Sequence, residues 1–323
     1  MQPALIGDIG ATNARFALLE DGAITAVDVL EVAAYSSLGD AILAYLERKA
    51  GAGLAKPSRG ALAVAGPVTG DFLSFTNHPW SFSIAALTRL IGFDRLEVVN
   101  DFVAQAMAVP HLGTGDRRQI GGGTPVVGAP VGVIGPGSGL GVSILVPTGA
   151  PDGWIPIASE GGHVTLPAVT ERETAIIGWL HRGGRDHVSA ETLICGPGLA
   201  SLYAGLSALD GGMAEALGPA EVTARAAAGS DPVAVEAVAI FCALLGTVAG
   251  NLALTAGARG GVFVAGGIVP KLGTLFDKSE FRARFVAKGR MRSYLEPIPA
   301  YVVTEPFPAF VGLAALMRRS GHG

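Results

Sequence analysis

The segment SEGGHVT, Ser159 to Thr165, holds a carboxylate at Glu160 and an imidazole at His163, separated by two glycines. This spacing suits half of a metal site, an acid/base pair or an ordinary turn. A metal site is weakly supported, because no HExxH motif, cysteine pair or second histidine at ligand spacing accompanies the two residues. Hydrogen bonding to a polyol suits them better, since a carboxylate accepts, an imidazole does either, and the glycines leave room for a ring.

Three glycine-rich turns follow apolar runs and could bind the phosphates of a nucleotide. The first lies in GDIGATNAR, Gly7 to Arg15, where glycines leave backbone N–H groups free to cradle an anion and Asp8 adds a carboxylate. The second is GPGSGLG, Gly135 to Gly141, and the third is VAGGIVP, Val264 to Pro270. The first two match neither the P-loop nor the G-x-G-x-x-G spacing, so each alone is typical of a hairpin turn. Together, three such turns at strand ends favour a phosphate with its magnesium ion.

Two further carboxylates stand where either a functional group or a helix cap is expected. VVNDF ends an apolar run with Asn100 and Asp101, and clefts of α/β folds collect their functional groups at strand ends. Asp101 is a candidate general base, a role worth roughly 10²- to 10⁴-fold in rate, or a cap of the following segment. Glu191, just after Ser189, is expected in the first turn of a helix, where the helix dipole favours negative charge. Both alternatives stay open at this stage.

The apolar runs between these turns predict the elements that hold them. ALIGDIG, ARFALLE and AITAVDVLEV predict three successive strands, the last two joined by a turn at Asp21-Gly22. RGALAVAGPV, LEVVNDF and GGVFVAGGIVP predict further strands, and helices are expected at about 38–50, at about 83–90 and in PAFVGLAALMRRS. PVGVIGPGSGLGVSILV repeats the opening order of strand, glycine turn and strand, and WIPIASEGGHV adds an extended segment. This echo predicts two similar lobes that each present a glycine turn to a shared cleft.

Length and composition support two lobes and exclude several classes of protein. A chain of 323 residues exceeds a single typical domain. Its 23 Lys and Arg against 27 Asp and Glu leave no basic surplus, so neither nucleic acid nor a membrane surface is an expected partner. Cys195 and Cys242 are expected as core thiols in a reducing compartment, rather than as a disulfide or a zinc cluster. MQPALIGDIG has no features of a secretion signal.

Two other segments have an alternative interpretation. Ala237 to Ala258 is long and apolar enough to cross a bilayer, but Asn251 and many small residues favour a buried helix. The basic run from Phe281 to Ser293 could be a nucleotide or partner site, but a solvated helix face is the expectation.

The chain resembles the bacterial glucokinase family of the hexokinase, Hsp70 and actin superfamily. The resemblance runs nearly end to end and rests on nine blocks in order: GDIGATNARFAL, VAGPVTGD, TNHPWSFS, LEVVNDF, GPGSGLGV, EGGHV, SAETLICGPGL, GNLALT and GGVFVAGGIVP. It implies an α/β, two-lobed ribonuclease H-like (actin-like ATPase) fold with a central cleft. The implied small α/β domain covers residues 1–110 plus 300–323, and the large α/β domain covers residues 111–299. The implied reaction transfers the γ-phosphoryl group of ATP to the 6-hydroxyl of glucose.

The resemblance also implies roles for individual residues. Sugar binding falls on Asn100, Asp101, Glu160, His163 and Glu191, with Asp101 as the base that takes the proton of the attacking hydroxyl. Phosphate binding falls on Gly7, Asp8, Ile9, Gly10, Ala11, Thr12, Asn13, Gly137, Ser138 and Gly139, and the nucleotide-facing turn on Gly266 and Gly267. Asp8 is implied to orient Mg²⁺ through water.

Two positions depart from the family pattern. Ala11 stands where glycine is commoner in GDxGGTN, which is expected to stiffen the first phosphate turn slightly. Thr165 follows EGGHV where aspartate is common, which puts any role of that neighbour in doubt.

Two rival functions are a hexose kinase of the same fold with another sugar preference and a non-catalytic sugar-sensing regulator. The related repressor, open reading frame and kinase family usually carries a Cys-rich zinc motif, which two isolated cysteines cannot form. A regulator calls for a DNA-binding extension or a lost base, yet Asp101 is present. Homodimers are common in the glucokinase family, so a homodimer is expected, and the reducing compartment inferred from the cysteines is taken to be the cytoplasm.

Overall fold

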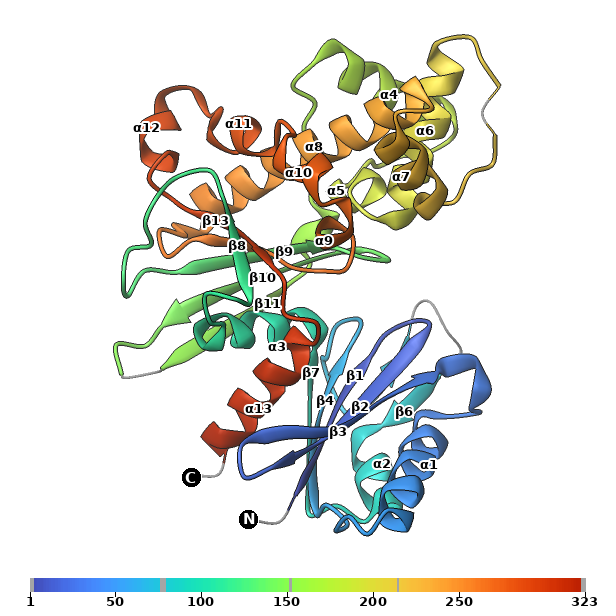
Figure 1. Cartoon of the computed structure of the whole chain (residues 1–323), viewed down its shortest axis with the longest axis vertical. Helices are drawn as coiled ribbons and strands as arrows, with labels where there is room; N and C mark the ends of the chain where they lie inside the picture. The colour runs from blue at the N-terminus through green and yellow to red at the C-terminus, as the bar shows by residue number, and fades with distance from the viewer. Residues whose placement is uncertain (1–2, 76–79, 151–152, 214, 321–323) are drawn as a thin grey trace. The chain divides into compact units, whose positions relative to one another are not determined.

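The computed structural model describes residues 3–75, 80–150, 153–213 and 215–320, and its contacts form two compact units (Figure 1). Unit 1 comprises the chain up to Leu112 together with the chain from Glu305 onward. Unit 2 is the intervening chain, Gly113–Thr304.

Unit 1 is built on a five-stranded sheet in the order β3-β2-β1-β4-β7. β1, β2 and β3 are antiparallel neighbours, whereas β1, β4 and β7 run parallel. Its strands are β1 (Ala4–Ile9), β2 (Asn13–Glu20), β3 (Ala23–Glu31), β4 (Arg59–Val64), β5 (Phe72–Ser74), β6 (Ser81–Ser83) and β7 (Arg95–Asn100). Its helices are α1 (Leu38–Gly51), α2 (Ile84–Ile91), α3 (Asp101–Ala108) and α13 (Pro308–Ser320). The predicted strands and helices of this part of the chain are confirmed.

The predicted turn between β2 and β3 has the backbone of a tight hairpin. Asp21 and Gly22 have φ angles of 47° and 86°. Two successive positive φ values match the twist of the flanking strands, and Asp-Gly is a preferred pair for them. The Asp-Gly prediction is therefore confirmed.

Helices cover both faces of this sheet (Figure 1). Leu5 and Ile9 of β1 pack with Tyr45 of α1 in one buried cluster, and α3 and α13 pack together on the other face. The two helices approach closely at Gly312, where an added Cβ would overlap the carbonyl oxygen of Ala104. Strands covered on both faces are expected to be mostly apolar, as residues 4–7 of β1 and 60–64 of β4 are.

Unit 2 contains a six-stranded sheet in the order β11-β10-β9-β12-β13-β8. Its strands are β8 (Arg117–Ile120), β9 (Val131–Pro136), β10 (Leu140–Pro147), β11 (Trp154–Ser159), β12 (Val262–Val264) and β13 (Ala300–Val303). Its helices are α4 (Glu171–Arg182), α5 (Ala190–Leu193), α6 (Gly196–Leu209), α7 (Pro219–Ala228), α8 (Pro232–Ala256), α9 (Val269–Leu272), α10 (Thr274–Asp277), α11 (Phe281–Val286) and α12 (Arg292–Leu295).

The strand order of unit 2 repeats that of unit 1. β11, β10 and β9 are antiparallel neighbours, and β9, β12 and β13 run parallel, as β3, β2, β1, β4 and β7 do. The predicted echo between the two glycine hairpins is therefore confirmed and extends to five strands. The predicted extended segment WIPIASEGGHV is strand only to Ser159, because Gly161–His163 form a turn of 3₁₀ helix.

α8 forms the centre of unit 2. Within the described residues it is the one helix long and apolar enough to cross a membrane, and 72% of its most apolar 18-residue window is buried inside the structure. Cys242 on this helix and Cys195 at the start of α6 are both buried and unpaired with each other. The expected buried helix and core thiols are confirmed.

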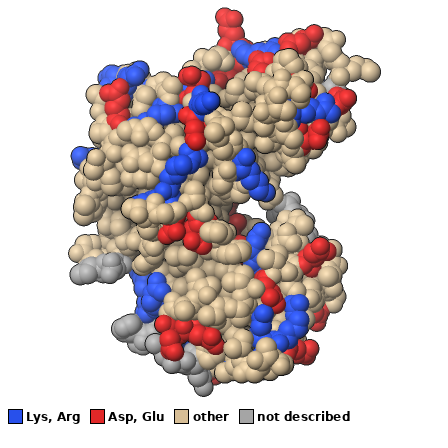
Figure 2. All heavy atoms as spheres, in the orientation of Figure 1, with Lys and Arg blue, Asp and Glu red and all other residues tan. Residues whose placement is uncertain are grey.

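The expectation of a solvated helix face for the basic run 281–293 is wrong for two of its arginines. Arg284 forms a paired hydrogen bond with the buried carboxylate of Glu173, at 2.8 and 3.1 Å, and also donates to the Thr247 hydroxyl. Arg282 donates to three backbone carbonyls, including that of Ile298. These side chains therefore join α11 to α4, α8 and the loops beside them. On the face in Figure 2, basic and acidic side chains are interspersed over each unit.

Candidate active site

In unit 1, three parallel strands bring predicted site residues to one edge of the sheet. The register pairs Ile9 of β1 with Val64 of β4, and Val64 with Asn100 of β7. The turn after β1, the loop after β4 and the start of α3 therefore lie together at the carboxyl ends of these strands. This is the edge at which open α/β sheets place their ligands.

Asn100 fixes the start of α3 with both ends of its amide. Its Oδ1 accepts hydrogen bonds from the amides of Phe102 and Val103, at 2.9 and 3.3 Å, and so caps the helix. Its Nδ2 donates to the carbonyl oxygen of Gly66 in the loop after β4, at 3.1 Å. Asp101 is consequently the first residue of α3, where the helix dipole stabilises a carboxylate. Asn100 is the N-cap, and the carboxylate of Asp101 also accepts a hydrogen bond from the Phe102 amide, at 2.9 Å.

Asp8 on β1 forms a cross-strand ion pair with Arg15 on β2. The two residues are register partners, and Arg15 Nη1 lies 3.1 Å from Asp8 Oδ2. Burial raises the pKa of Asp8, and the neighbouring guanidinium opposes part of that rise. The sequence did not single out Arg15, although a hairpin closing at residues 10–12 sets these two positions opposite each other.

The hairpin formed by β1 and β2 is tightly packed at Gly7 and closed at Gly10. An added Cβ on Gly7 would lie 2.7 Å from the Leu62 side chain and 3.0 Å from the Phe16 ring, so these side chains would have to shift. The Gly10 amide donates to the Asn13 carbonyl at 3.0 Å, which closes the turn around Ala11 and Thr12. The predicted phosphate residues from Gly7 to Asn13 therefore form one compact hairpin end.

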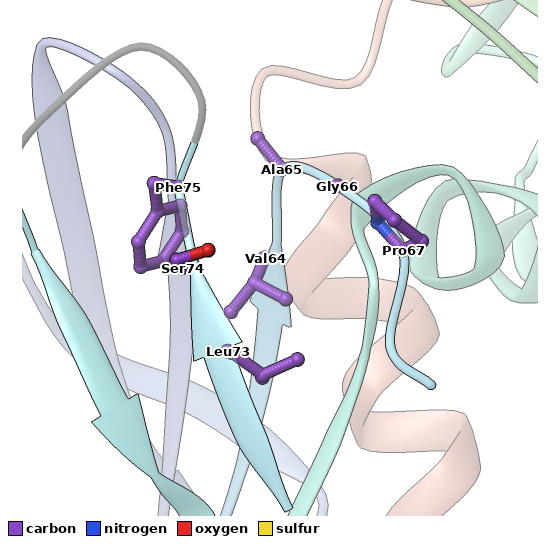
Figure 3. Close-up of a pocket in the computed structure, with 7 residues that line it drawn as sticks. All are labelled: Val64, Ala65, Gly66, Pro67, Leu73, Ser74 and Phe75. Atoms are coloured by element: carbon purple, nitrogen blue, oxygen red, sulfur yellow. The ribbon is translucent and has the colours of Figure 1, made fainter. Parts of the chain in front are cut away.

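A small pocket lies beside this edge, between the end of β4 and strand β5 (Figure 3). Val64 and Leu73 point toward each other in it, and the loop from Ala65 to Pro67 forms its rim. Gly66, whose carbonyl holds Asn100, is part of this rim. Residues 76–79 of the TNHPWSFS block, which follow β5, lie outside the described residues.

In unit 2, the other two glycine turns lie side by side at the ends of β9 and β12. β9 and β12 are parallel partners, and the amide of Ala265 donates to the carbonyl of Ile134 at 2.8 Å. Gly266 follows with φ +81°, and an added Cβ would lie 2.5 Å from the carbonyl oxygen of Pro136. Gly267, by contrast, faces open space. The predicted phosphate and nucleotide turns of this unit are thus adjacent.

Glu160, His163 and Glu191 also come together in unit 2. His163 Nε2 lies 3.9 Å from Glu160 Oε2 and 4.0 Å from Glu191 Oε1. The three side chains are partly exposed, with Glu160 and His163 more than half accessible to solvent. They form a polar wall able to pair with several hydroxyl groups.

A short backbone ladder brings Glu191 to this wall. The amide of Ala190 donates to the Val164 carbonyl at 2.8 Å, and that of Leu166 donates to the Val188 carbonyl at 3.0 Å. Thr165 faces Ser189 in this ladder, and its hydroxyl lies 3.1 Å from His187 Nε2. The residue that departs from the family pattern is therefore part of the junction between EGGH and α5.

The predicted residues thus form two groups, one in each unit. Unit 1 holds the hairpin end Gly7–Asn13 with Asn100 and Asp101, and unit 2 holds the polar wall of Glu160, His163 and Glu191 with the second and third glycine turns. Among the described residues, no group of three or more His, Cys, Asp and Glu side chains could hold a metal ion by itself. Glycine turns at strand ends, one polar wall and a carboxylate at a helix start are the kinds of group that transfer of a phosphoryl group to a hydroxyl requires.

Comparisons with known proteins agree on one family. The family model described as Glucokinase matches residues 5–320. The glucokinase of Paramagnetospirillum magneticum is 50% identical over 317 residues, with 98% of each chain covered. The bifunctional protein glk of Burkholderia pseudomallei is 49% identical over 317 residues, and the match spans 48% of that longer protein.

A solved structure gives the same result for the fold. The glucokinase from an Antarctic psychrotroph superimposes with a TM-score of 0.85 at 36% identity, with 99% of each chain covered. The predicted fold class, α/β of the actin-like ATPase type, is confirmed.

Proposed function

This chain belongs to the glucokinase family, and we propose that it transfers the γ-phosphoryl group of ATP to the 6-hydroxyl of D-glucose, giving glucose 6-phosphate and ADP. The observation that carries the proposal is the 50% identity to a named glucokinase over 98% of both chains.

Asp101 is the proposed general base. Its position as the first residue of α3 supports this role, because the helix dipole favours its ionised form and Asn100 holds the helix start in place. The carboxylate would accept the proton of the 6-hydroxyl as that oxygen attacks the phosphoryl group. Asn100 itself has its carbonyl oxygen and one amide hydrogen committed to backbone partners, so it would contribute to the sugar through its remaining N–H.

The glycine turns are proposed to bind the phosphates of ATP. Gly7 to Asn13 and Gly137 to Gly139 would supply backbone N–H groups, and Gly266 and Gly267 would face the nucleotide. Magnesium fits this set, because the ion is commonly held by one or two carboxylates together with phosphates and water, and Asp8 is the carboxylate at the first turn. Bound Mg²⁺ would neutralise charge on the transferred group. Arg15 would hold the Asp8 carboxylate at the edge of the turn.

Glu160, His163 and Glu191 are proposed to select the sugar. Groups built to pair with hydroxyls are left unpaired by an epimer that misplaces one, which costs affinity. The short distances between these three side chains support recognition of neighbouring hydroxyls on one ring.

The organisation of the chain is part of the same proposal. The two units are proposed as the two domains of the family's two-lobed fold. The borders predicted from the sequence, near residues 110 and 300, belong to this proposal. The protein is further proposed to act in the cytoplasm as a homodimer, which light scattering would test.

The test is a coupled assay of phosphoryl transfer over a panel of sugars and phosphoryl donors. We expect glucose with MgATP to give the highest kcat/KM. A higher kcat/KM with mannose or an N-acetylated sugar would show that glucose is not the preferred substrate, although the protein would still be a hexose kinase. Sugar binding without any turnover would instead identify a non-catalytic sugar sensor.

A further inference from the structure

Glu191 contacts two parts of unit 2 at once. Its Oε1 lies 4.0 Å from His163 Nε2 in the proposed sugar wall. Its Oε2 accepts a 2.7 Å hydrogen bond from the amide of Leu140, the first residue of β10. Leu140 directly follows the phosphate turn Gly137–Gly139. One carboxylate therefore spans from the sugar wall to the turn.

The Leu140 amide has this partner because of the strand register. β10 pairs with β11 only from Val142 onward, opposite Ser159. On the other side, the Gly137 amide already closes the turn on the Gly139 carbonyl, at 2.8 Å. A backbone donor at this position needs an acceptor, and the Glu191 carboxylate supplies one.

Gly139 in the turn and Gly162 in EGGH both leave room for this contact. An added Cβ on Gly139 would overlap Glu191 Oε2, and an added Cβ on Gly162 would overlap the carbonyl oxygen of Leu140. The backbone of Leu140 thus lies between Glu191 and Gly162. A side chain at residue 139 would therefore force the Glu191 carboxylate to move from its present position.

The same segment also holds the other end of the turn. The amide of Gly196, at the start of α6, donates to the Gly137 carbonyl at 2.8 Å. Both anchors of the turn, Glu191 and Gly196, therefore come from the eight residues that begin at Ser189. A shift of this segment on sugar binding would move the turn with it.

We propose that Glu191 is a positioning residue for the phosphate turn Gly137–Gly139, and that it couples the binding of sugar to the binding of nucleotide. The coupling rests on the proposed function, in which Oε1 meets the sugar and the turn meets phosphate. Sugar that fixes the carboxylate also fixes the Leu140 amide, so each ligand raises the affinity for the other by the same factor.

The first experiment needs no ligand. Amide hydrogen exchange at Leu140 is measured in the wild type, Glu191→Ala, Glu191→Gln and Glu160→Ala. Glu191→Ala is expected to accelerate exchange by about tenfold or more, since it removes a charge-assisted hydrogen bond. Glu191→Gln keeps an acceptor oxygen and is expected to restore most of the protection. Glu160→Ala removes a carboxylate from the same wall without touching the turn. Equal exchange in Glu191→Ala and wild type would overturn the positioning role.

The second experiment measures coupling. Calorimetry gives the Kd of a non-hydrolysable ATP analogue with Mg²⁺, in the presence and absence of glucose. Glu191→Ala is expected to weaken analogue binding without sugar by about tenfold and to abolish most of the enhancement by glucose. Glu160→Ala is expected to leave analogue binding without sugar within about twofold of wild type. An equal loss in both variants would overturn the coupling role of Glu191.

A third substitution checks the geometry. Gly139→Ala is expected to displace the Glu191 carboxylate, so combining it with Glu191→Ala should cost less analogue affinity than the two single losses together. Additive losses would contradict the contact. If the wild type binds no nucleotide, the proposed function and the coupling fail together, while Leu140 exchange still decides whether Glu191 holds the turn.

Discussion

The loops after β4 and β12 have the same sequence at their start and opposite packing. Val64-Ala65-Gly66 in unit 1 matches Val264-Ala265-Gly266 in unit 2, and both glycines have positive φ, at +121° and +81°. A Cβ on Gly66 would meet nothing within 4 Å, whereas a Cβ on Gly266 would lie 2.5 Å from a backbone carbonyl. The same strand topology therefore leaves Gly66 on an open pocket rim in unit 1 and packs Gly266 against the backbone of Pro136 in unit 2.

The last parallel strands of the two sheets differ in a second way. β7 ends at Asn100 and passes directly into α3, so that Asp101 stands at a helix start. β13 ends at Val303, and Thr304 instead bonds to the carbonyls of Gly115 and Asp116. Equivalent strand ends therefore carry a candidate catalytic group in one unit and a structural contact in the other.

The largest expected effect tests this difference at the strand ends. Asp101→Asn is expected to lower kcat by roughly 10²- to 10⁴-fold while glucose binding remains measurable, because the base is lost and the sugar wall is intact. Thr304→Ala is the matched control and is expected to retain kcat within about twofold, as it lies outside the proposed machinery. A coupled assay and calorimetry measure the two quantities. Undiminished turnover of Asp101→Asn would remove this residue from the base role.

The next effect tests the buried arginine–carboxylate pair of unit 2, in which Arg284 binds Glu173. Removing one partner of a buried pair costs about 3 to 5 kcal/mol, so Glu173→Gln is expected to lower the free energy of unfolding by about that amount at pH 7. Glu171→Gln, on the exposed side of the same helical turn, is the control and is expected to cost under about 0.5 kcal/mol. Urea unfolding measures both variants.

The pH dependence of the Glu173 effect follows from its pKa. Burial alone would raise the pKa of Glu173. The hydrogen bonds from Arg284 and from backbone amides outweigh this effect, and the pKa lies below its usual value of 4.5. The unfolded chain therefore binds this proton more tightly than the folded chain. The stabilisation is complete above about pH 4.5 and is lost as the pH falls through the folded pKa. The difference in free energy of unfolding between wild type and Glu173→Gln should therefore decrease as the pH falls below about 4.5. A difference that does not change with pH would contradict the ion pair.

A smaller effect tests the two matched glycines. Gly266→Ala is expected to lower the free energy of unfolding by about 2 to 3 kcal/mol, because it combines an unfavourable φ with a clash against Pro136. Gly66→Ala meets only the φ penalty and is expected to cost about 1 kcal/mol. An equal loss in free energy of unfolding for the two variants would show that packing does not distinguish Gly66 from Gly266.

The smallest effect is expected from alkylation of the two cysteines in the wild-type protein. Both cysteines of the chain, Cys195 and Cys242, lie in unit 2 and are buried. Burial raises the pKa of Cys242 to about 12, so its thiolate fraction at pH 8 is roughly 10⁻⁴. Alkylation is therefore expected only when unit 2 opens. If unit 1 unfolds at a lower urea concentration, labelling should begin at a higher concentration than that loss of structure. Mass spectrometry of labelled protein at rising urea checks this order.

Much of this plan is predictable from local patterns. Apolar runs and the Asp21-Gly22 turn predict the strands of both hairpins, and their repeated order predicts the repeated topology. The partners of Asn100 and Glu191 are not predictable in this way, since they depend on backbone groups 34 and 51 residues away in the chain. Arg284 shows the same limit, because its partner Glu173 lies 111 residues away and turns an apparently solvated charge into a buried pair. The roles of the site residues come from the family resemblance and stay predictions.

The packing of α13 against α3 has a consequence for how the protein is made. Unit 1 is interrupted by the whole of unit 2, so on the ribosome its sheet emerges early but lacks its last helix. At about 5 to 20 residues per second, the intervening chain takes roughly 10 to 40 s to synthesise. During that interval the apolar surface of α3 around Ala104 awaits a helix not yet translated. Unit 2, continuous in sequence, can fold first, and nascent unit 1 is the part that a chaperone would be expected to bind.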